Sequence, residues 1–147
     1  MNGFVALAVI LGLVAAATVA GLVWRARTGH VRREKAGERI TANDVGTASF
    51  GTGATLLQFS TEFCAPCRAT ARILGEIEAE RTGVEHLEVD LTRRPDLAGR
   101  FSILQTPTTL VLDGTGTVRA RIGGAVRAGE VRSTLDDLLG STHVRTV

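Results

Sequence analysis

The sequence opens with a long apolar run. Residues 4–24 carry no charged side chain, and Thr18 contributes the single side-chain hydroxyl of the run. As a helix rising about 1.5 Å per residue, the run would be about 31 Å long, close to the hydrocarbon thickness of a bilayer. The alternatives are a buried core helix and a cleaved signal peptide. A signal peptide starts with basic residues and has a shorter apolar stretch, whereas residues 1–3 carry no basic side chain. The pattern therefore predicts an uncleaved transmembrane helix.

Beyond residue 39 the pattern alternates between the periods of strands and helices. In chain order it predicts a helical turn at 41–44, a strand at 55–59, a helix from Cys64 to about Gly83, a strand at 84–91, a short helix at 95–101, strands at 108–112 and 118–122, and a closing helix around 131–139. The first two strands should be parallel because a helix connects them, and the last two should form an antiparallel hairpin. This order predicts an α/β domain with a central mixed sheet flanked by helices.

These patterns divide the chain into five regions. They are a short N-terminal end (residues 1–3), the transmembrane helix (4–24), a basic juxtamembrane linker (25–39), the α/β domain (40–140) and a tail (141–147). The α/β region has roughly 100 residues, which is enough for one hydrophobic core.

The charge distribution predicts how the chain is oriented. Residues 25–39 hold six basic and two acidic side chains, and because the whole chain has a net charge of +2, this segment's +4 leaves −2 for the rest. Basic flanks stay in the cytoplasm, so we expect the N-terminus outside and everything after residue 24 inside. A nucleic-acid contact is the competing interpretation. Positive charge beside a membrane span favours anionic lipid instead, and the sequence carries no nucleic-acid-binding signature.

Two cysteines, Cys64 and Cys67, stand where the first long strand gives way to a helix. A zinc site normally needs four ligands, and the three histidines are too scattered to complete one, so no metal is expected. A structural disulfide closing so small a loop would stabilise little. A redox-active dithiol fits the setting, because free amides at a helix N-terminus stabilise a thiolate. We expect Cys64 to be the exposed attacking thiolate and Cys67 the inward-facing resolving thiol.

From about Ile40 to Leu139 the chain resembles the thioredoxin superfamily, in particular membrane-anchored thioredoxin-like proteins of bacterial type. The resemblance rests on the element order, on Phe63-Cys64-Ala65-Pro66-Cys67, on Thr106-Pro107-Thr108 and on Gly123-Gly124. It implies a thioredoxin-like fold with a cis Thr106–Pro107 peptide bond close to the cysteines. It also implies that the Thr106 backbone binds an extended substrate peptide, together with Pro107, Phe63, Ala65 and Pro66.

Two residues depart from the family pattern. Phe63 stands where thioredoxins usually have Trp, and Gln58 stands where they usually have a buried Asp that helps to deprotonate the resolving thiol. An amide cannot take up a proton at neutral pH. Glu88 on the neighbouring strand could replace the missing carboxylate only if it faced inward. It alternates with apolar neighbours and should lie on the face opposite to them. We therefore expect slower exchange or a water relay. His86 and His143 receive no role, and His86 is expected to be a solvated strand residue.

The expected function is that of a membrane-tethered thiol–disulfide oxidoreductase. The cytoplasm keeps thiols reduced, so the expected orientation implies a reductase of protein disulfides. No bound cofactor is needed, and the expected partners are protein disulfide substrates, an upstream thiol reductase and the lipid bilayer. Two alternatives remain. One is an extracytoplasmic thiol reductase of the cytochrome c maturation type, which residues 106–109 also resemble, and the other is a redox-inert thioredoxin-fold binding module.

Overall fold

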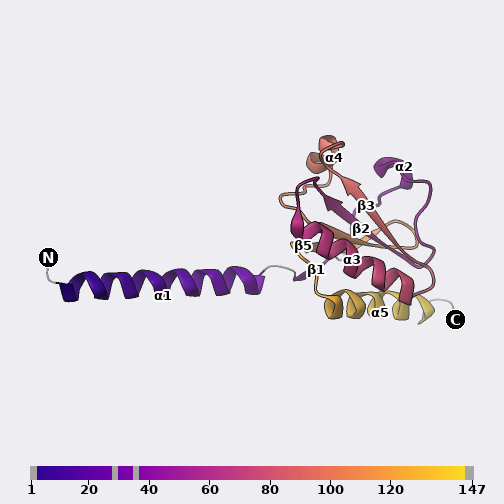
Figure 1. Cartoon of the computed structure of the whole chain (residues 1–147). Helices are drawn as coiled ribbons and strands as arrows, with labels where there is room; N and C mark the ends of the chain where they lie inside the picture. The colour runs from indigo at the N-terminus through magenta and orange to yellow at the C-terminus, as the bar shows by residue number, and fades with distance from the viewer. Residues whose placement is uncertain (1–2, 28–29, 35–36, 145–147) are drawn as a thin grey trace.

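The computed structural model describes residues 3–27, 30–34 and 37–144. Within them, the helix α1 (Gly3–Arg27) precedes a domain built from a five-stranded sheet and four further helices (Figure 1). In chain order the domain contains β1 (Val31–Arg33), α2 (Ala42–Val45), β2 (Ala54–Ser60), α3 (Ala65–Glu80), β3 (Val84–Asp90), α4 (Pro95–Arg100), β4 (Thr108–Asp113), β5 (Val118–Gly123) and α5 (Ala128–Val144).

The helix α1 is apolar along nearly its whole length. The segment Gly3–Trp24 is long and apolar enough to cross a bilayer, and none of its most apolar stretch is buried against the rest of the protein. The core of the domain is therefore built without α1. Both a membrane span and a signal sequence near an N-terminus have this length and composition.

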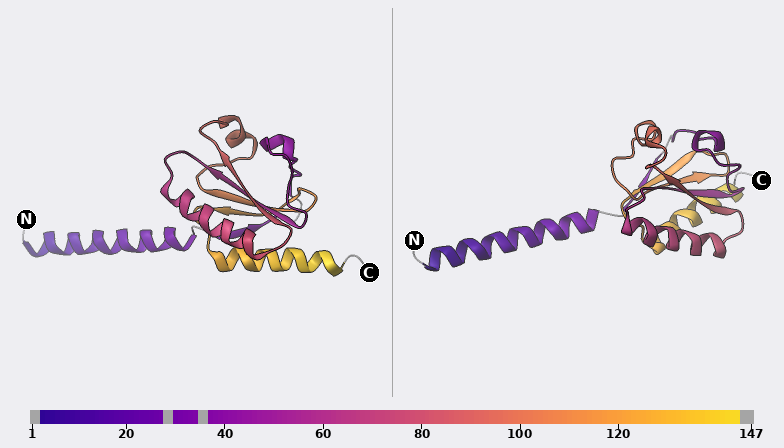
Figure 2. Two further views of the ribbon diagram at one scale, coloured as in Figure 1. Left: turned by 45° about the vertical axis from the view of Figure 1, so that its right-hand side comes forward. Right: turned by 45° about the horizontal axis from the view of Figure 1, so that its top comes forward.

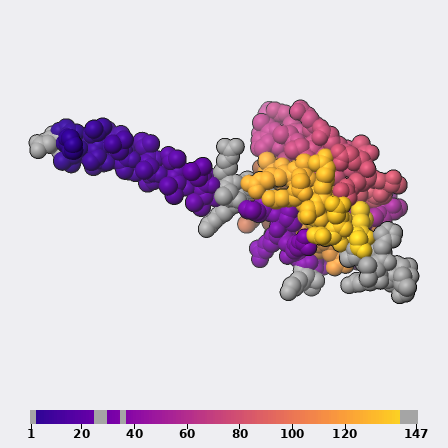
Figure 3. Space-filling view, turned by 90° about the horizontal axis from the view of Figure 1, so that it is seen from below, coloured from indigo at the N-terminus to yellow at the C-terminus, as the bar shows by residue number. Residues whose placement is uncertain are grey.

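The sheet is mixed, with the strand order β1-β5-β4-β2-β3. Strands β2 and β3 are parallel, as predicted from the helix that connects them, and the other pairs are antiparallel. Helices α3 and α5 cover one face of the sheet, while α2 and α4 lie on the other (Figure 2). Seen from the side that α3 and α5 cover, α5 lies across the domain with α3 beside it (Figure 3). This is the mixed α/β architecture predicted from the sequence.

Strand β2 lies between two hydrophobic cores, one on each face of the sheet, and contributes side chains to both. All seven of its residues are buried, because it has a neighbour on each side and helices on both faces. Leu57 and Phe59 join the core under α2 and α4. Leu56 points the other way, into the core with Leu74 of α3 and Leu135 of α5. Alternate side chains of a strand point to opposite faces, so Gln58 also faces α3.

The strand β1 lies in the segment predicted as linker, so residues 31–33 belong to the sheet. Val31 pairs with Ile122, and Arg33 pairs with Ala120, through antiparallel backbone contacts with β5. Val31 also packs against the core beneath α5. A three-residue strand with two arginines shows no alternation of apolar side chains, and its pairing depends on the backbone. The sequence pattern therefore could not reveal it.

The predicted strands and helices are otherwise present, with ends shifted by a few residues. The short turn predicted at 41–44 is α2, where the Thr41 backbone N–H donates to the Asp44 carboxylate at 2.8 Å. Helix α5 continues to Val144 and enters the predicted tail. Residues 145–147 of that tail, and residues 1 and 2 of the predicted N-terminal end, lie outside the described residues.

The fold predicts a sharp difference between two leucines of the same region of sequence. Leu110 is fully buried on β4, whereas Leu104 is 95% exposed in the preceding loop. Leu110→Ala should lower the free energy of unfolding by about 2–5 kcal/mol, because it removes core contacts and leaves a cavity. Leu104→Ala should change it by less than about 0.5 kcal/mol. Urea unfolding of the full chain in detergent measures both, and equal effects would contradict this placement of β4.

Candidate active site

Cys64 caps the N-terminus of α3. The chain leaves β2 at Ser60, and Cys64 has an extended backbone conformation before the helix begins at Ala65. The Cys67 backbone N–H donates to the Cys64 Sγ at 3.2 Å, and Pro66 occupies the first turn, where a missing N–H costs little. The first amides of a helix have no partner within the helix, and the helix dipole favours negative charge there. The sulfur of Cys64 therefore lies where a thiolate is stabilised.

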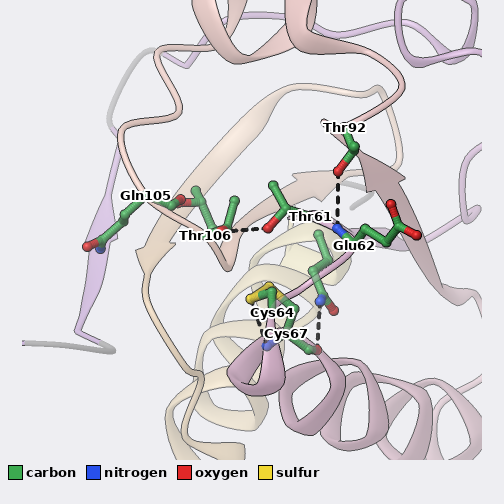
Figure 4. Close-up of a disulfide and its surroundings, with 9 residues drawn as sticks. Thr61, Glu62, Cys64, Cys67, Thr92, Gln105 and Thr106 are labelled. Atoms are coloured by element: carbon green, nitrogen blue, oxygen red, sulfur yellow. Dashed lines mark hydrogen bonds between the residues drawn. A yellow bond between two sulfur atoms is a disulfide. The ribbon is translucent and has the colours of Figure 1, made fainter.

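Cys64 and Cys67 are joined by a disulfide bond, with their Cα atoms 5.2 Å apart (Figure 4). Cys67 is 2% exposed and faces inward, as predicted. The prediction of an exposed Cys64 is wrong for this state, since its exposed fraction is only 7%. A disulfide directs each sulfur toward the other, so Cys64 turns toward its buried partner. The exposed neighbours are Phe63, with 93% of its surface accessible, and Ala65 and Pro66.

The loop before β4 lies beside the cysteines. The Thr106–Pro107 peptide bond is cis, which confirms the expectation from the family resemblance. The hydroxyl oxygens of Thr106 and Thr61 are 3.4 Å apart, and this contact links the loop to the segment that leads into α3 (Figure 4). Thr106 is half-buried and Pro107 is buried. The structure thus brings Thr106 and Pro107 into the same region as the disulfide.

Gly124, the second glycine of the Gly123-Gly124 pair, holds this loop at the end of β5. A Cβ on Gly123 would meet only the end of the exposed Gln105 side chain, which can move away. Gly124 has a φ of 84°, a left-handed conformation that favours glycine, and its backbone N–H donates to the Pro107 carbonyl oxygen at 2.8 Å. Gly124 therefore supports the cis-proline loop from the end of β5.

Gln58 lies beneath the cysteine pair and is fully buried. Its Nε2 donates to the Cys67 carbonyl oxygen at 2.9 Å, and its Oε1 lies 3.1 Å from the Nε2 of His86. Both ends of the amide are therefore satisfied, as a buried polar group requires. Because an amide does not ionise, Gln58 holds the base of the site without adding a charge.

The prediction of a solvated His86 is wrong. His86 is half-buried, and burial lowers its pKa below the ordinary value, while the carboxylates of Glu78 and Glu88 act in the opposite direction. Glu88 itself is exposed and lies opposite the face of its apolar neighbours, as expected. In the register of β2 and β3, Gln58 pairs with Glu88 and Leu56 with His86, so all four lie on the α3 face. Only this register could have revealed the Gln58–His86 contact.

Within residues 3–27, 30–34 and 37–144, no group of three or more histidine, cysteine, aspartate or glutamate side chains is placed to hold a metal ion. A sulfur at a helix N-terminus, a buried second sulfur and a cis-proline loop beside both suit thiol–disulfide exchange.

The thioredoxin family model matches residues 47–137, so the chain belongs to the thioredoxin family. Thioredoxin C-3 of Corynebacterium nephridii is 30% identical over 84 residues, which are 57% of this chain and 57% of that protein. The bifunctional thioredoxin reductase/thioredoxin of Mycobacterium leprae is 28% identical over 82 residues, which are 55% of this chain and 18% of that protein. The chain thus spans little more than half, or less, of these relatives. The oxidised mitochondrial thioredoxin 3 of Saccharomyces cerevisiae shares the fold, with a TM-score of 0.52, 21% identity, and coverage of 59% of this chain and 80% of that one.

The helix N-terminus predicts that the two reduced cysteines differ in reactivity. After reduction, alkylation of Cys64 should rise with pH at a midpoint below the ~8.5 of a free cysteine. Cys67 should react more slowly, because it lies within the helix and not at its cap, and because it is 2% exposed against 7% for Cys64. The measurement is the alkylation rate against pH, with Cys67→Ser isolating Cys64 and Cys64→Ser isolating Cys67. A midpoint for Cys64 like that of the free amino acid would show that the helix does not activate it.

Proposed function

We propose that this protein is a thiol–disulfide oxidoreductase that reduces protein disulfides through Cys64 and Cys67. The observation that carries the proposal is the disulfide at the N-terminus of α3, where the Cys67 backbone N–H donates to the Cys64 sulfur. The same hydrogen bond would stabilise a Cys64 thiolate in the reduced protein, and the thiolate is the reactive form. Membership of the thioredoxin family supports this activity.

The reaction proceeds by two exchanges. The Cys64 thiolate attacks one sulfur of a substrate disulfide, so that a Cys64–substrate bond forms, and the other substrate sulfur leaves as a thiolate and takes a proton from solvent. Cys67, after losing its proton, attacks the Cys64 sulfur and releases the second substrate thiolate. Two electrons pass from the dithiol to the substrate. The Cys64–Cys67 disulfide, which is the state of this structure, is the oxidised product.

The surface around the sulfurs suits an extended peptide. Phe63 is almost fully exposed beside Cys64, and Ala65 and Pro66 are exposed in the first turn of α3. We assign these three residues to substrate contact, together with Thr106 and Pro107. The backbone of Thr106 would pair with the substrate main chain, which is a form of strand addition. Such pairing accepts many sequences because it reads the backbone.

Turnover requires a reductant that returns the disulfide to the dithiol. The exchange uses sulfur atoms alone, so the protein needs no resident cofactor, and an upstream thiol reductase would supply the electrons. The Mycobacterium leprae relative carries both thioredoxin reductase and thioredoxin in its name. We therefore propose a thioredoxin reductase as the upstream partner of this chain.

The N-terminal helix would tether the domain to the lipid bilayer as a single span at residues 4–24. Its length and apolar composition support this assignment. The basic residues that follow favour an N-terminus outside and a domain in the cytoplasm. A reducing compartment suits a reductase, because the disulfide would be kept in its dithiol form.

Cysteine variants test the activity. Cys64→Ser should abolish the reduction of insulin disulfides, because no attacking thiolate remains. Cys67→Ser should accumulate mixed disulfides with substrates, because the second exchange cannot occur. The assay couples the full chain in detergent to thioredoxin reductase and NADPH, with the wild type as the positive control. Full turnover by Cys64→Ser would refute the mechanism, and a wild type that never cycles would favour the redox-inert binding module.

A topology map tests the tether. Fusion of a reporter that is active only outside the cytoplasm to the C-terminus should give no activity, whereas a reporter that is active only in the cytoplasm should be active. Both fusions should sediment with membranes and resist extraction at high salt. The opposite pattern of reporter activity would favour the extracytoplasmic reductase, and a soluble, shortened chain would indicate a cleaved signal peptide.

A further inference from the structure

The buried polar chain beneath the disulfide contains a residue that the exchange mechanism has not used. His86 on β3 contacts Gln58 on β2, and Gln58 contacts the backbone of Cys67 on α3. Three consecutive elements of the chain thus meet through one amide. We infer that His86 is a positioning residue for the second exchange, because it fixes the Gln58 amide with its NH₂ group against the resolving cysteine.

Hydrogen-bond directions determine the arrangement of the three groups. The Cys67 carbonyl oxygen only accepts, so the Gln58 group facing it at 2.9 Å must be the NH₂. The Gln58 oxygen then faces the His86 Nε2 at 3.1 Å, and this nitrogen must carry a hydrogen. The structure therefore requires the Nε2-protonated tautomer of His86 while its imidazole is neutral. The opposite tautomer would set two acceptors against each other.

The orientation of the amide has a consequence for the second exchange. The NH₂ group is the positive end of the amide dipole, and it lies at the base of the helix turn that carries Cys67. A positive end bound to the backbone carbonyl of Cys67 adds positive potential at the residue that carries the resolving thiol, and positive potential favours its thiolate, the nucleophile of the second exchange. Because Gln58 cannot accept the proton, the Cys67 proton passes to solvent, and the amide assists by stabilising the thiolate that remains. Loss of the His86 donor would leave the buried amide oxygen unpaired and the amide free to turn.

The contact between His86 and Gln58 does not depend on the charge of the His86 ring. Burial disfavours the imidazolium form, while Glu78 of α3 and Glu88 of β3 favour it. In both charge states the Nε2 carries a hydrogen, so the contact with Gln58 persists when His86 titrates. The residue thus acts through hydrogen-bond direction, and its role does not depend on a change of charge.

The inference predicts a selective effect on the second exchange, and it rests on the proposed function for its place in the cycle. An aromatic disulfide that releases a coloured thiolate (dithio-bis-nitrobenzoate) reports both steps. One equivalent appears when Cys64 attacks, and a second appears when Cys67 resolves the adduct. In His86→Phe, which keeps a ring but has no donor, the second phase should slow by about three- to tenfold. The first phase should stay within about twofold of the wild type.

Two further variants separate positioning from general damage to the fold. His86→Gln keeps a side-chain N–H donor and should restore most of the second-phase rate. Glu88→Gln alters the charge beside His86 but leaves its N–H in place, so both phases should match the wild type. An unchanged second phase in a folded His86→Phe, or equal slowing in His86→Phe and His86→Gln, would overturn the inference.

A spectrum of the wild-type chain tests the geometry without any variant. Nitrogen-15 NMR of the full chain in detergent should show the His86 ring protonated at Nε2 in the oxidised protein. A neutral ring protonated at Nδ1 alone would overturn the inference whatever the kinetics. If the wild type releases both coloured equivalents but fails to reduce insulin, the proposed function fails while the role of His86 stands.

Discussion

The hydrogen bond from the Cys67 amide to the Cys64 sulfur depends on where α3 begins, and that point is set by the sheet. Strand β2 is buried along its whole length, so its course is fixed by packing on both faces. The chain leaves β2 at Ser60 and starts α3 at Ala65, which places Cys64 at the cap. The unpaired amides of that first turn then face a sulfur. The redox chemistry thus follows from the packing of a central strand and the position of one helix terminus.

Sequence periodicity is sufficient for the elements that bury many side chains. Strand β2 and helix α3 have clear apolar patterns, and the structure contains both at the predicted places. Features that depend on pairing between separate segments could not be predicted from periodicity. The short strand β1 is held by backbone contacts to β5, and His86 meets Gln58 through the register of β2 and β3. Pairing of this kind leaves no periodic trace in one sequence.

Gln58 shows how a buried polar position can serve a site without charge. A carboxylate at this position would have to be desolvated, which is costly unless it is paired or protonated. An amide avoids that cost when both of its ends are hydrogen-bonded, as they are here between Cys67 and His86. The consequence is the loss of a proton acceptor beneath the resolving thiol. A chain with Gln58 therefore favours the second exchange by orienting a dipole and relies on solvent to carry the proton.

The strand β1 also changes what the proposed tether implies. A linker of residues 25–39 would let the domain move well away from the bilayer, but β1 fixes residues 31–33 to the edge of the sheet. Only three residues separate the end of α1 at Arg27 from Val31, so that the Cα atoms of these two residues can be at most about 14 Å apart. On the proposed topology, the sheet edge would lie near the headgroups, where the nearby arginines would meet anionic lipid.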